Sequence, residues 1–446
     1  MDSILTKGSP IKGIILFSIP LLLGNIFQQI YTLSDTLIVG RVVGVQALAS
    51  VGATNGLTFL IIGFAQGMTT GLSIITAQHY GAGDVKAVKQ SFATSIWICG
   101  VFALMLTVVS VLAARPLLEM MQTPANIIDG ATTFLTIIFG GVLATIFFNL
   151  FSNMLRALGN SRLPLVFLVI ACIINVVLDI ILIVFLHMGV AGAGIATVTA
   201  QLISCFLCWF YIKSHVPVLS LEVKEIKTNM KLVREQIKIG LPMGFQASII
   251  AIGSIILQIS LNHLGSSAIA AYTAAGKVDQ LATQPMMSLG ITMATFTAQN
   301  YGAKKFKRIL KGIRQTLITS VAYSFIVGAL IILNSRVLVN LFIGNSEQHI
   351  TNLAHEYFVI VSASYFLLAI LFIIRYTLQG FGKSVAPTMA GVAELISRML
   401  VGLFVVPAFG FWGACTANPL AWLGSNLVLV YSYVQVVRQL RKRAEP

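Results

Sequence analysis

Residues 77–82 have the sequence Ala-Gln-His-Tyr-Gly-Ala, and residues 298–303 repeat it as Ala-Gln-Asn-Tyr-Gly-Ala. The similarity extends without gaps over Gly44–Gly83 and Gly265–Lys304, where 11 of 40 positions are identical. The identical residues include Gln, Tyr and Gly as well as apolar residues, so chance similarity between apolar helices does not account for them. The chain therefore contains an internal repeat with an offset of 221 residues.

The repeat extends beyond this stretch at nearly the same offset. Pro20 pairs with Pro242, and Gly189-x-x-Gly192-Ala193 pairs with Gly410-x-x-Gly413-Ala414. The stretch Leu155-x-x-x-Gly159-x-Ser161-x-x-Pro164 likewise matches Leu378-x-x-x-Gly382-x-Ser384-x-x-Pro387. The two halves of the chain are therefore predicted to share one fold.

Composition places both halves in a membrane. Of the 446 residues 57% are hydrophobic and 10% are charged, whereas soluble domains carry about 25% charged residues. This excludes a soluble enzyme, a secreted disulfide scaffold and a disordered chain, and the continuous apolar runs exclude a β-barrel. With about 20 apolar residues per spanning helix, twelve segments are predicted: 14–40, 47–79, 90–114, 127–154, 164–187, 190–212, 237–262, 268–299, 313–334, 352–379, 386–407 and 412–437.

The repeat and the spans together define the expected domains. Six spans separate equivalent positions, so both copies run in the same direction through the membrane, as in a parallel repeat. We predict an all-α integral membrane protein of twelve transmembrane helices in two six-helix lobes, residues 1–212 and 239–446. Residues 213–238 mix Lys and Arg with apolar residues, and they are predicted to form a cytoplasmic amphipathic helix on the membrane surface.

Basic residues fix the predicted orientation. The net charge is +15, but 23 of the 29 Lys and Arg residues fall on the side of the membrane that also holds both termini. Only Arg41, Arg115 and Arg336 fall on the opposite side. The positive-inside rule therefore predicts cytoplasmic termini, and the charge is expected to meet anionic lipid rather than nucleic acid.

Ionisable residues inside the predicted spans are the first functional candidates, because a charge in the bilayer centre is costly. Asp35 lies roughly 8 Å from the outer end of the first span and Asp179 roughly 12 Å from the outer end of the fifth, at 1.5 Å per residue. Asn175 precedes Asp179 by one helical turn, and Thr197 reaches a similar depth in the sixth span. Two close carboxylates repel each other in a low-dielectric medium, and a proton or a hard cation such as Na⁺ would relieve that repulsion.

The second lobe lacks these acids, since Asp35 and Asp179 correspond there to positions near Leu257 and Gly402. It holds Glu394 and Arg398 four residues apart, which predicts an ion pair within one helix, and Arg375 is expected to join it. The roles of Arg375, Glu394, Arg398, Lys277 and Asp279 stay open, although Lys277 or Asp279 could line a cleft. The asymmetry predicts that only the first lobe handles a coupling ion.

Amides in the first lobe are candidates for a cavity wall. Gln28 shares a helix face with Asp35, two turns away, and Asn149 and Asn153 are one turn apart in the fourth span. Such amides line cavities, but they also form hydrogen bonds between helices. Pro20 interrupts the hydrogen bonds of the first span and allows a bend there.

Motifs of other classes are absent. The sequence has no Walker loop, no completed HExxH, no GxSxG and no aspartate-rich prenyl-transfer motif. Its five cysteines lie in apolar segments, which predicts reduced packing residues rather than disulfides or zinc ligands. The chain is thus predicted to be a protein without enzymatic activity or cofactor.

The chain resembles the multidrug and toxic compound extrusion (MATE) family of transporters over essentially its whole length. The resemblance rests on Ser34-Asp35-Thr36-x-x-Val39-Gly40, Gln78-x-Tyr80-Gly81-Ala82-Gly83, Leu155-Arg156-Ala157-x-Gly159, Asn175-x-x-x-Asp179 and Gly192-Ala193-Gly194-x-Ala196-Thr197. It implies a monomeric exporter of organic, often cationic, compounds in the cytoplasmic membrane, driven by inward H⁺ or Na⁺.

The resemblance also implies roles for individual residues. Asp35, Asn175, Asp179 and Thr197 match residues implicated in binding the proton or Na⁺, and the carbonyl of Ala193 matches a further ligand. Gln28, Asn149 and Asn153, together with Asp35, match positions of the drug cavity, and Pro20 matches the bend of the first helix. Spans seven and ten hold Gln246, Gln258 and Arg375 instead of the acids of one family branch, which argues against a second cation site.

Two alternatives remain from the sequence. A lipid-linked oligosaccharide flippase of the same superfamily would need a cationic cavity for pyrophosphate, for which Lys277, Arg375 and Arg398 are the candidates. A polytopic membrane enzyme would need a catalytic motif that the sequence does not contain.

Overall fold

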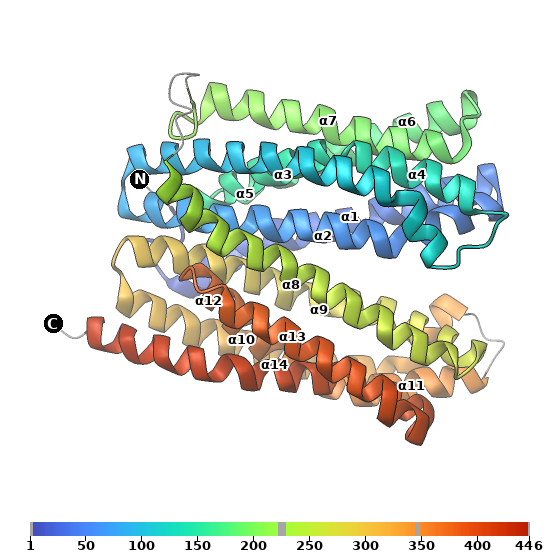
Figure 1. The fold of residues 1–446 in the computed structure, drawn as a ribbon. Coiled ribbons are helices and arrows are strands. Elements are labelled where there is room, and N and C mark those ends of the chain that lie inside the picture. The colour runs from blue at the N-terminus through green and yellow to red at the C-terminus, as the bar shows by residue number, and fades with distance from the viewer. Residues whose placement is uncertain (1–2, 222–228, 344–347, 445–446) are drawn as a thin grey trace. The chain divides into compact units, whose positions relative to one another are not determined.

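The computed structural model describes residues 3–221, 229–343 and 348–444. Long helices follow one another with short connections (Figure 1). Over the first half they are α1 (Pro10–Ile38), α2 (Val45–Ala82), α3 (Val85–Met120), α4 (Ile128–Gly140), α5 (Val142–Ala157), α6 (Arg162–Asp179) and α7 (Gly189–His215). The π-helical segments η1 (Val39–Val43) and η2 (Ile180–Phe185) continue α1 and α6.

The second half follows the same order. Its helices are α8 (Met230–Asn262), α9 (Ser266–Gly302), α10 (Phe306–Ile343), α11 (Gln348–Ala363), α12 (Tyr365–Gly380), α13 (Val385–Leu400) and α14 (Val406–Ala444), with the π-helical segment η4 (Val401–Val405) between the last two. Gly189 and Gly410, which are equivalent in the repeat, both have positive φ, at 59° and 60°. This backbone conformation favours glycine, and Gly410 turns the chain back inside α14.

The number of spans agrees with the sequence prediction. Eight of the described helices are long and apolar enough to cross a membrane, and the bent pairs α4–α5 and α11–α12 each supply one further span. α9 is equally long but less apolar, and the turn at Gly410 divides the continuous helical stretch Val385–Ala444, counted above as one helix, into two membrane-length parts. The described residues thus provide the twelve membrane-length segments predicted. Large apolar side chains such as Leu112, Phe210 and Leu333 face outward, as lipid contact requires.

The bend of 45° between α4 and α5 lies inside a predicted single span, as does the equal bend between α11 and α12. At the first bend the α4 helix ends at Gly140, and Gly141 packs directly against Val198 of α7. Neither bend contains a proline, but the first lies at the helix-weakening pair Gly140-Gly141, a signal that the prediction of one continuous span did not use.

The chain packs as two compact units whose boundaries differ from the predicted lobes. Unit 1 contains Pro20–Ser248 and unit 2 contains Asp2–Ile19 with Ile249–Pro446. The helices α1 and α8 are each shared between the units. The start of α8 belongs to unit 1 although the rest of α8 belongs to unit 2, and the start of α1 belongs to unit 2 although the rest of α1 belongs to unit 1. The predicted lobes 1–212 and 239–446 follow hydropathy and the repeat, whereas these units follow packing, so the lobes stay a prediction.

Hydrogen bonds hold the chain's beginning in unit 2. Arg308 of α10 donates from Nε to the carbonyl oxygen of Leu5 at 3.1 Å and from Nη2 to that of Lys7 at 2.7 Å. Lys305 Nζ donates to the Thr6 carbonyl at 2.8 Å, and Asn300 Nδ2 to the Leu5 carbonyl at 3.0 Å. The segment before α1 is thus fastened to the α9–α10 corner.

The start of α8 is held in unit 1 by a buried amide. Gln236 Nε2 donates to the carbonyl and hydroxyl oxygens of Ser91 of α3, both at 2.8 Å, and Ser95 Oγ donates to Gln236 Oε1 at 3.2 Å. Val233 is buried beside it. Residues 230–238 of the predicted surface helix are thus the packed beginning of α8, while residues 222–228 lie outside the described residues.

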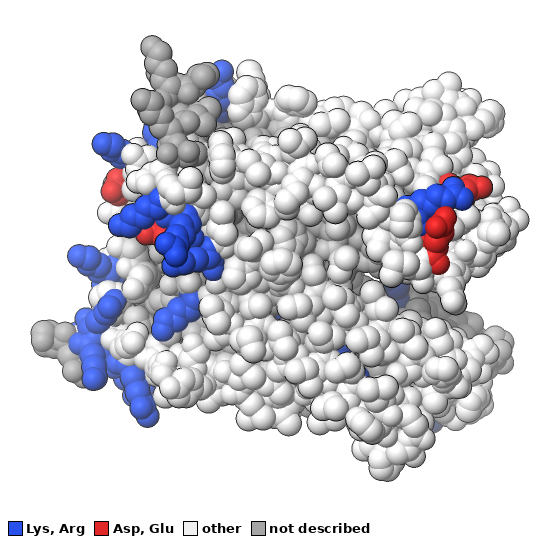
Figure 2. Space-filling model, in the orientation of Figure 1, with Lys and Arg blue, Asp and Glu red and all other residues white. Residues whose placement is uncertain are grey.

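Charges divide between the two ends of the helices within each unit. Figure 2 shows Lys and Arg gathered at one end, with a small group of both signs at the other end of unit 1. In that small group Arg115 pairs with Glu119 and Asp129, both at 3.1 Å. Within each unit the excess of Lys and Arg therefore gathers at one end of the helices.

Candidate functional site

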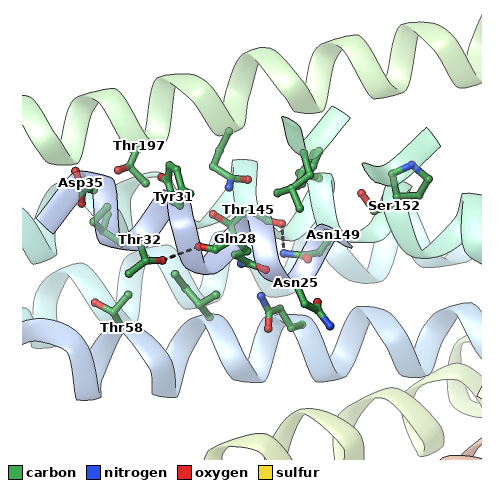
Figure 3. Close-up of a pocket in the computed structure, with 18 of the residues that line it drawn as sticks. Asn25, Gln28, Tyr31, Thr32, Asp35, Thr58, Thr145, Asn149, Ser152 and Thr197 are labelled. Atoms are coloured by element: carbon green, nitrogen blue, oxygen red, sulfur yellow. Dashed lines mark hydrogen bonds between the residues drawn. The ribbon is translucent and has the colours of Figure 1, made fainter. Parts of the chain in front are cut away.

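A cavity of about 250 Å³ lies within unit 1. It is bounded by side chains of α1, α2, α4, α5, α6 and α7, and Figure 3 shows the labelled polar ones pointing toward it. The polar lining residues are Asn25, Gln28, Tyr31, Thr32, Asp35, Thr36, Asn55, Thr58, Gln66, Thr145, Asn149, Ser152, Arg156, Ser161, Thr197 and Gln201. Its wall combines these amides and hydroxyls with apolar side chains, a combination suited to an amphiphilic organic ligand.

Asp35 and Asp179 meet at one end of this cavity. Asp35 lies in the last turns of α1 and lines the cavity, and its carboxyl group lies beside that of Asp179, the last residue of α6. One oxygen of each carboxyl group, Oδ1, is buried without a hydrogen-bond partner among the described residues. The structure thus brings the two aspartates together as the sequence predicts, and it leaves two oxygen atoms available to a further ligand.

Asn175 connects the aspartates to α7. In the orientation that its neighbours favour, the amide nitrogen donates to Asp179 Oδ2 at 3.0 Å and the amide oxygen accepts from the Thr197 backbone N–H at 3.2 Å. Asn175 and Asp179 are both fully buried, one turn apart on α6. The α6 helix gives way to the π-helical η2 directly after Asp179, a backbone change that is frequent at functional sites.

Tyr31 completes the cluster and was not singled out from the sequence. It precedes Asp35 by one turn of α1, and its hydroxyl group is hydrogen-bonded to Thr197. The sequence feature that could have identified Tyr31 is its spacing of four residues from Asp35, which places both side chains on one helix face. Ala193 is buried one turn before Thr197 on α7.

The predicted cavity residues divide into two groups. Gln28, Asn149 and Pro20 line the cavity with Asp35, and Asn149 Nδ2 also donates to the Thr145 carbonyl oxygen at 2.8 Å. Asn153 is not among the lining residues. Its Nδ2 donates to Thr69 Oγ1 at 3.1 Å and to Thr70 Oγ1 at 3.3 Å, so it joins α5 to α2.

An oxygen-rich set of donors faces the aspartate end. The carboxylates of Asp35 and Asp179 and the Thr197 hydroxyl are the groups that could hold a hard cation such as Na⁺, and the Asn175 amide oxygen could join them only if the amide turned over so that its nitrogen donated to Thr197 Oγ1. In the described part of the chain, no three His, Cys, Asp or Glu side chains form a metal-binding group. Carboxylate, amide and hydroxyl oxygens are the ligand atoms that hard cations prefer.

Comparison with known proteins identifies the family. The MatE family model matches residues 20–181 and 242–404, which correspond to the two copies of the internal repeat. The chain belongs to the MatE family. This MatE chain is thus a member of a transporter family rather than an enzyme, as the sequence predicts.

Curated relatives cover nearly the whole MatE chain. It is 28% identical to the probable multidrug resistance protein YoeA of Bacillus subtilis, over 97% of this chain and 95% of that protein. It is 23% identical to the multidrug export protein MepA of Staphylococcus aureus (strain N315), over 95% of this chain and 94% of that protein. The chain therefore matches nearly the whole length of these relatives.

Solved structures show the same fold. A MATE crystal structure in complex with MaL6 superposes with a TM-score of 0.91 at 20% identity, covering 99% of this chain and 100% of the other. A MOP superfamily transporter from Pyrococcus furiosus, described as having a binding pocket of reversed polarity, superposes at 0.88 with 19% identity, covering 100% of this chain and 99% of the other. The fold therefore leaves pocket polarity open, and this MatE chain's own side chains must define it.

The ion-pair cluster of the MatE chain's second half is buried in unit 2. Glu394 accepts from Arg375 of α12 through Oε1 and from Arg398 through Oε2, the latter at 3.3 Å. Arg375 Nη2 also donates to Ser425 Oγ at 2.9 Å. The predicted ion pair is present with Arg375 joined to it. Two of the three cations on which the flippase alternative depends are therefore paired with one carboxylate.

Asp279 lies elsewhere in unit 2. Its Oδ1 is buried without a hydrogen-bond partner among the described residues, as is the hydroxyl group of Tyr365, the first residue of α12. It shares no ion pair with the Arg375–Glu394–Arg398 cluster among the described residues. The acid–acid arrangement of unit 1 thus has no counterpart in the described part of unit 2.

Proposed function

We propose that this chain is a multidrug efflux antiporter, which exports cationic organic compounds across the cytoplasmic membrane in exchange for inward H⁺ or Na⁺. The neighbouring carboxyl groups of Asp35, which lines the unit 1 cavity, and Asp179, which is buried behind it, carry the proposal. The family and the export functions in the names of its relatives support it. The basic end of the helices would face the cytoplasm, with both termini.

The exchange would follow from competition for one negative charge. The carboxyl pair binds a proton, or Na⁺ with the Asn175 and Thr197 oxygens, and the neutralised site loses its attraction for a cationic compound in the cavity. When the ion leaves toward the cytoplasm, the restored charge attracts the next compound. Because ion and compound each weaken the binding of the other, the free energy of ion entry is coupled to export.

Pro20 would act as the bending point of α1 during this cycle. Pro20 is the first residue of α1 that packs with unit 1, and it also lines the cavity. Proline lacks the N–H that would bond to the carbonyl oxygen one turn earlier, so the helix bends there at low cost.

The coupling ion can be determined with purified protein in liposomes. A fluorescent cationic dye is loaded inside, and its release is followed under an imposed proton gradient or an imposed Na⁺ gradient. Dye exchange that requires one of these gradients supports the antiporter and names the ion. Gradient-independent scrambling of labelled lipid without dye exchange would instead support the flippase.

A further inference from the structure

A groove of about 50 Å³ lies at the basic end of unit 2. It is formed where the end of α9, the turn between α12 and α13 and the end of α14 meet, and its lining includes Tyr301, Phe381, Lys383, Leu440 and Arg443. Figure 2 shows Lys and Arg gathered at this end of the helices. The groove is much smaller than the unit 1 cavity, so it has room for a small group of atoms rather than for a whole organic compound.

Aromatic side chains hold the Arg443 guanidinium at this groove. Its Nη1 donates to the Tyr301 hydroxyl oxygen at 3.2 Å, and its Cζ lies 5.9 Å from the centre of the Phe306 ring. The Tyr301 ring packs edge-on against Phe306 and Phe381, with ring centres 6.1 and 5.3 Å apart. Among the described residues only the Tyr301 hydroxyl accepts from this guanidinium, so most of its five N–H groups are left for an anion.

Lys383 brings a second cation to the groove through a fixed turn. α12 ends at Gly380, and Gly382 has a positive φ of 78°. The Gly382 N–H donates to the Gln379 carbonyl oxygen at 2.7 Å, and the Lys383 N–H donates to that of Leu378 at 3.0 Å. These are the hydrogen bonds of a helix end closed by glycine. The backbone thus sets the position of the exposed Lys383 side chain at the groove.

Charge and apolar surface together indicate the kind of ligand. No described carboxylate forms an ion pair with Lys383 or Arg443, so the groove carries two uncompensated positive charges. Apolar surface begins directly beside it, because Val385 and Met389, one turn apart at the start of α13, are 69% and 51% exposed. A water-soluble anion would use only the charges, whereas an anion that carries an acyl chain would also cover this apolar surface.

The equivalent position in the other copy of the repeat carries no charge. Lys383 corresponds to Asn160, whose Oδ1 accepts from the backbone N–H groups of Arg162 and Leu163, both at 3.1 Å. Phe381 corresponds to Leu158. The pairing of a cation with an aromatic ring at this turn is therefore particular to unit 2.

We propose that this groove binds the phosphate group of an anionic phospholipid, with Arg443 and Lys383 as the binding residues and an acyl chain along Val385 and Met389. The paired N–H groups of arginine match two phosphate oxygens, and the lysine ammonium adds a third donor. Basic pockets at the cytoplasmic ends of membrane helices suit such headgroups. In the proposed orientation the lipid belongs to the cytoplasmic leaflet. The inference does not depend on the efflux function, since it concerns another unit and another ligand.

Two lipids with the same acyl chains test the charge requirement on the wild-type protein. Delipidated protein in detergent is titrated with dioleoyl phosphatidylglycerol, which is anionic, or with dioleoyl phosphatidylcholine, which is zwitterionic. Native mass spectrometry gives the dissociation constant of the first bound lipid. We expect the phosphatidylglycerol to bind about tenfold more tightly or better, because two cations face its single negative charge. Equal affinities would overturn the inference.

Two double variants with the same change of net charge assign the preference to the groove. Lys383→Gln with Arg443→Gln should weaken binding of the first phosphatidylglycerol about tenfold or more. Lys307→Gln with Lys442→Gln is the matched control, because both lysines are exposed at the same end of unit 2 and neither lines the groove. It should change the affinity by less than about twofold. An equal loss in both double variants would show diffuse attraction to the basic surface and reject the groove.

The single variant Lys383→Gln keeps the test decisive if the double variant does not fold. It breaks no hydrogen bond or ion pair of a described side chain, and it should weaken phosphatidylglycerol binding several-fold at an unchanged melting temperature. Unchanged affinity in Lys383→Gln would contradict the inference.

A soluble competitor separates a lipid site from a site for free phosphate. Glycerol phosphate carries the same phosphate chemistry without acyl chains, and we expect it to displace no bound phosphatidylglycerol even in large excess. Displacement at concentrations comparable to that of the lipid would show a site for a soluble phosphate and overturn the lipid assignment. Either result leaves the proposed efflux function to its own test.

Discussion

The carboxyl group of Asp35 on α1 lies beside that of Asp179 on α6, although the four helices α2 to α5 separate them in the chain. The contact is possible because both residues occupy the final turns of their helices, where η1 and η2 begin. Since the two acids share one location, an ion that neutralises either of them changes the charge of the whole pair.

Removing either acid is expected to stop coupled transport. Asp35→Asn and Asp179→Asn keep the size of each side chain but remove the charge for which ion and compound compete. We expect drug export to fall to background in cells that express normal amounts of protein. Asp129→Asn is the matched control, because Asp129 is exposed and pairs only with Arg115. Unchanged export in both site variants would rule out the proposed ion site.

The Asn175 amide is expected to set the affinity of the aspartate pair for the coupling ion, although it carries no charge itself. Asn175→Leu removes the donor to Asp179 Oδ2 and the acceptor of the Thr197 N–H, both of which are buried. Each lost buried hydrogen bond costs about 1–3 kcal/mol. We expect the concentration of coupling ion needed for half-maximal exchange to change about tenfold or more, measured in liposomes. Asn126→Leu, at an exposed position between α3 and α4, serves as control and should leave it unchanged.

Loss of the Glu394 charge is expected to lower the stability of the folded protein strongly, because Glu394 neutralises both arginines of the unit 2 cluster. Glu394→Gln leaves Arg375 and Arg398 buried without a counter-ion, and breaking a buried pair costs about 3–5 kcal/mol. The melting temperature in detergent should fall sharply. Glu119→Gln changes an exposed pair with Arg115 and should leave it unaltered. Restored stability in the triple variant Glu394→Gln, Arg375→Met, Arg398→Met would confirm that the unpaired charges cause the loss.

Close packing of α2 against the start of α8 is expected to tolerate no extra methyl group. A Cβ at Gly71 would lie 2.6 Å from the Gly240 Cα, so Gly71→Ala must push the helices apart. Overpacking of this kind costs about 1–3 kcal/mol, which thermal unfolding would detect. Gly100→Ala on α3 is the matched control, because an added Cβ there meets no atom within 4 Å. A Gly71→Ala protein as stable as the control would contradict the close contact.

The bend of α1 is expected to matter for rate more than for stability. Pro20→Ala restores the missing N–H and favours a straight helix. We expect dye export to slow several-fold while the melting temperature stays equal or rises. Pro116→Ala near the end of α3 is the control, since that proline does not line the cavity. Undiminished export by Pro20→Ala would remove Pro20 as a bending point.

Much of this architecture could be predicted because it depends on regular patterns. Apolar runs located the spans, the repeat located the two halves, and helical depth brought Asp35 and Asp179 to one level. The unit boundaries could not be predicted, because they depend on contacts with no sequence signature. Arg308, for example, binds backbone carbonyls of Leu5 and Lys7, which any residue could supply.

Both aspartates of the site could be predicted from regular patterns, but other residues of the cavity wall could not. Charged residues in apolar segments stand out, which identified both aspartates. Arg156 was instead assigned to the cytoplasmic surface, because it follows the apolar part of its span closely. Only the bend between α4 and α5 and the packing of α5 explain its place in the cavity wall. The separation of Asn153 from the cavity likewise depends on two threonines of α2.

The exchanged half-helices limit how this chain can be divided. A gene cut between α7 and α8 would yield one fragment whose first residues lack the α9–α10 corner, and another whose opening turns lack Ser91 and Ser95. Each fragment would expose an N-terminal segment that residues of the other fragment bind in the intact chain. Separately made halves should therefore be degraded, whereas halves made together in one cell should rescue each other.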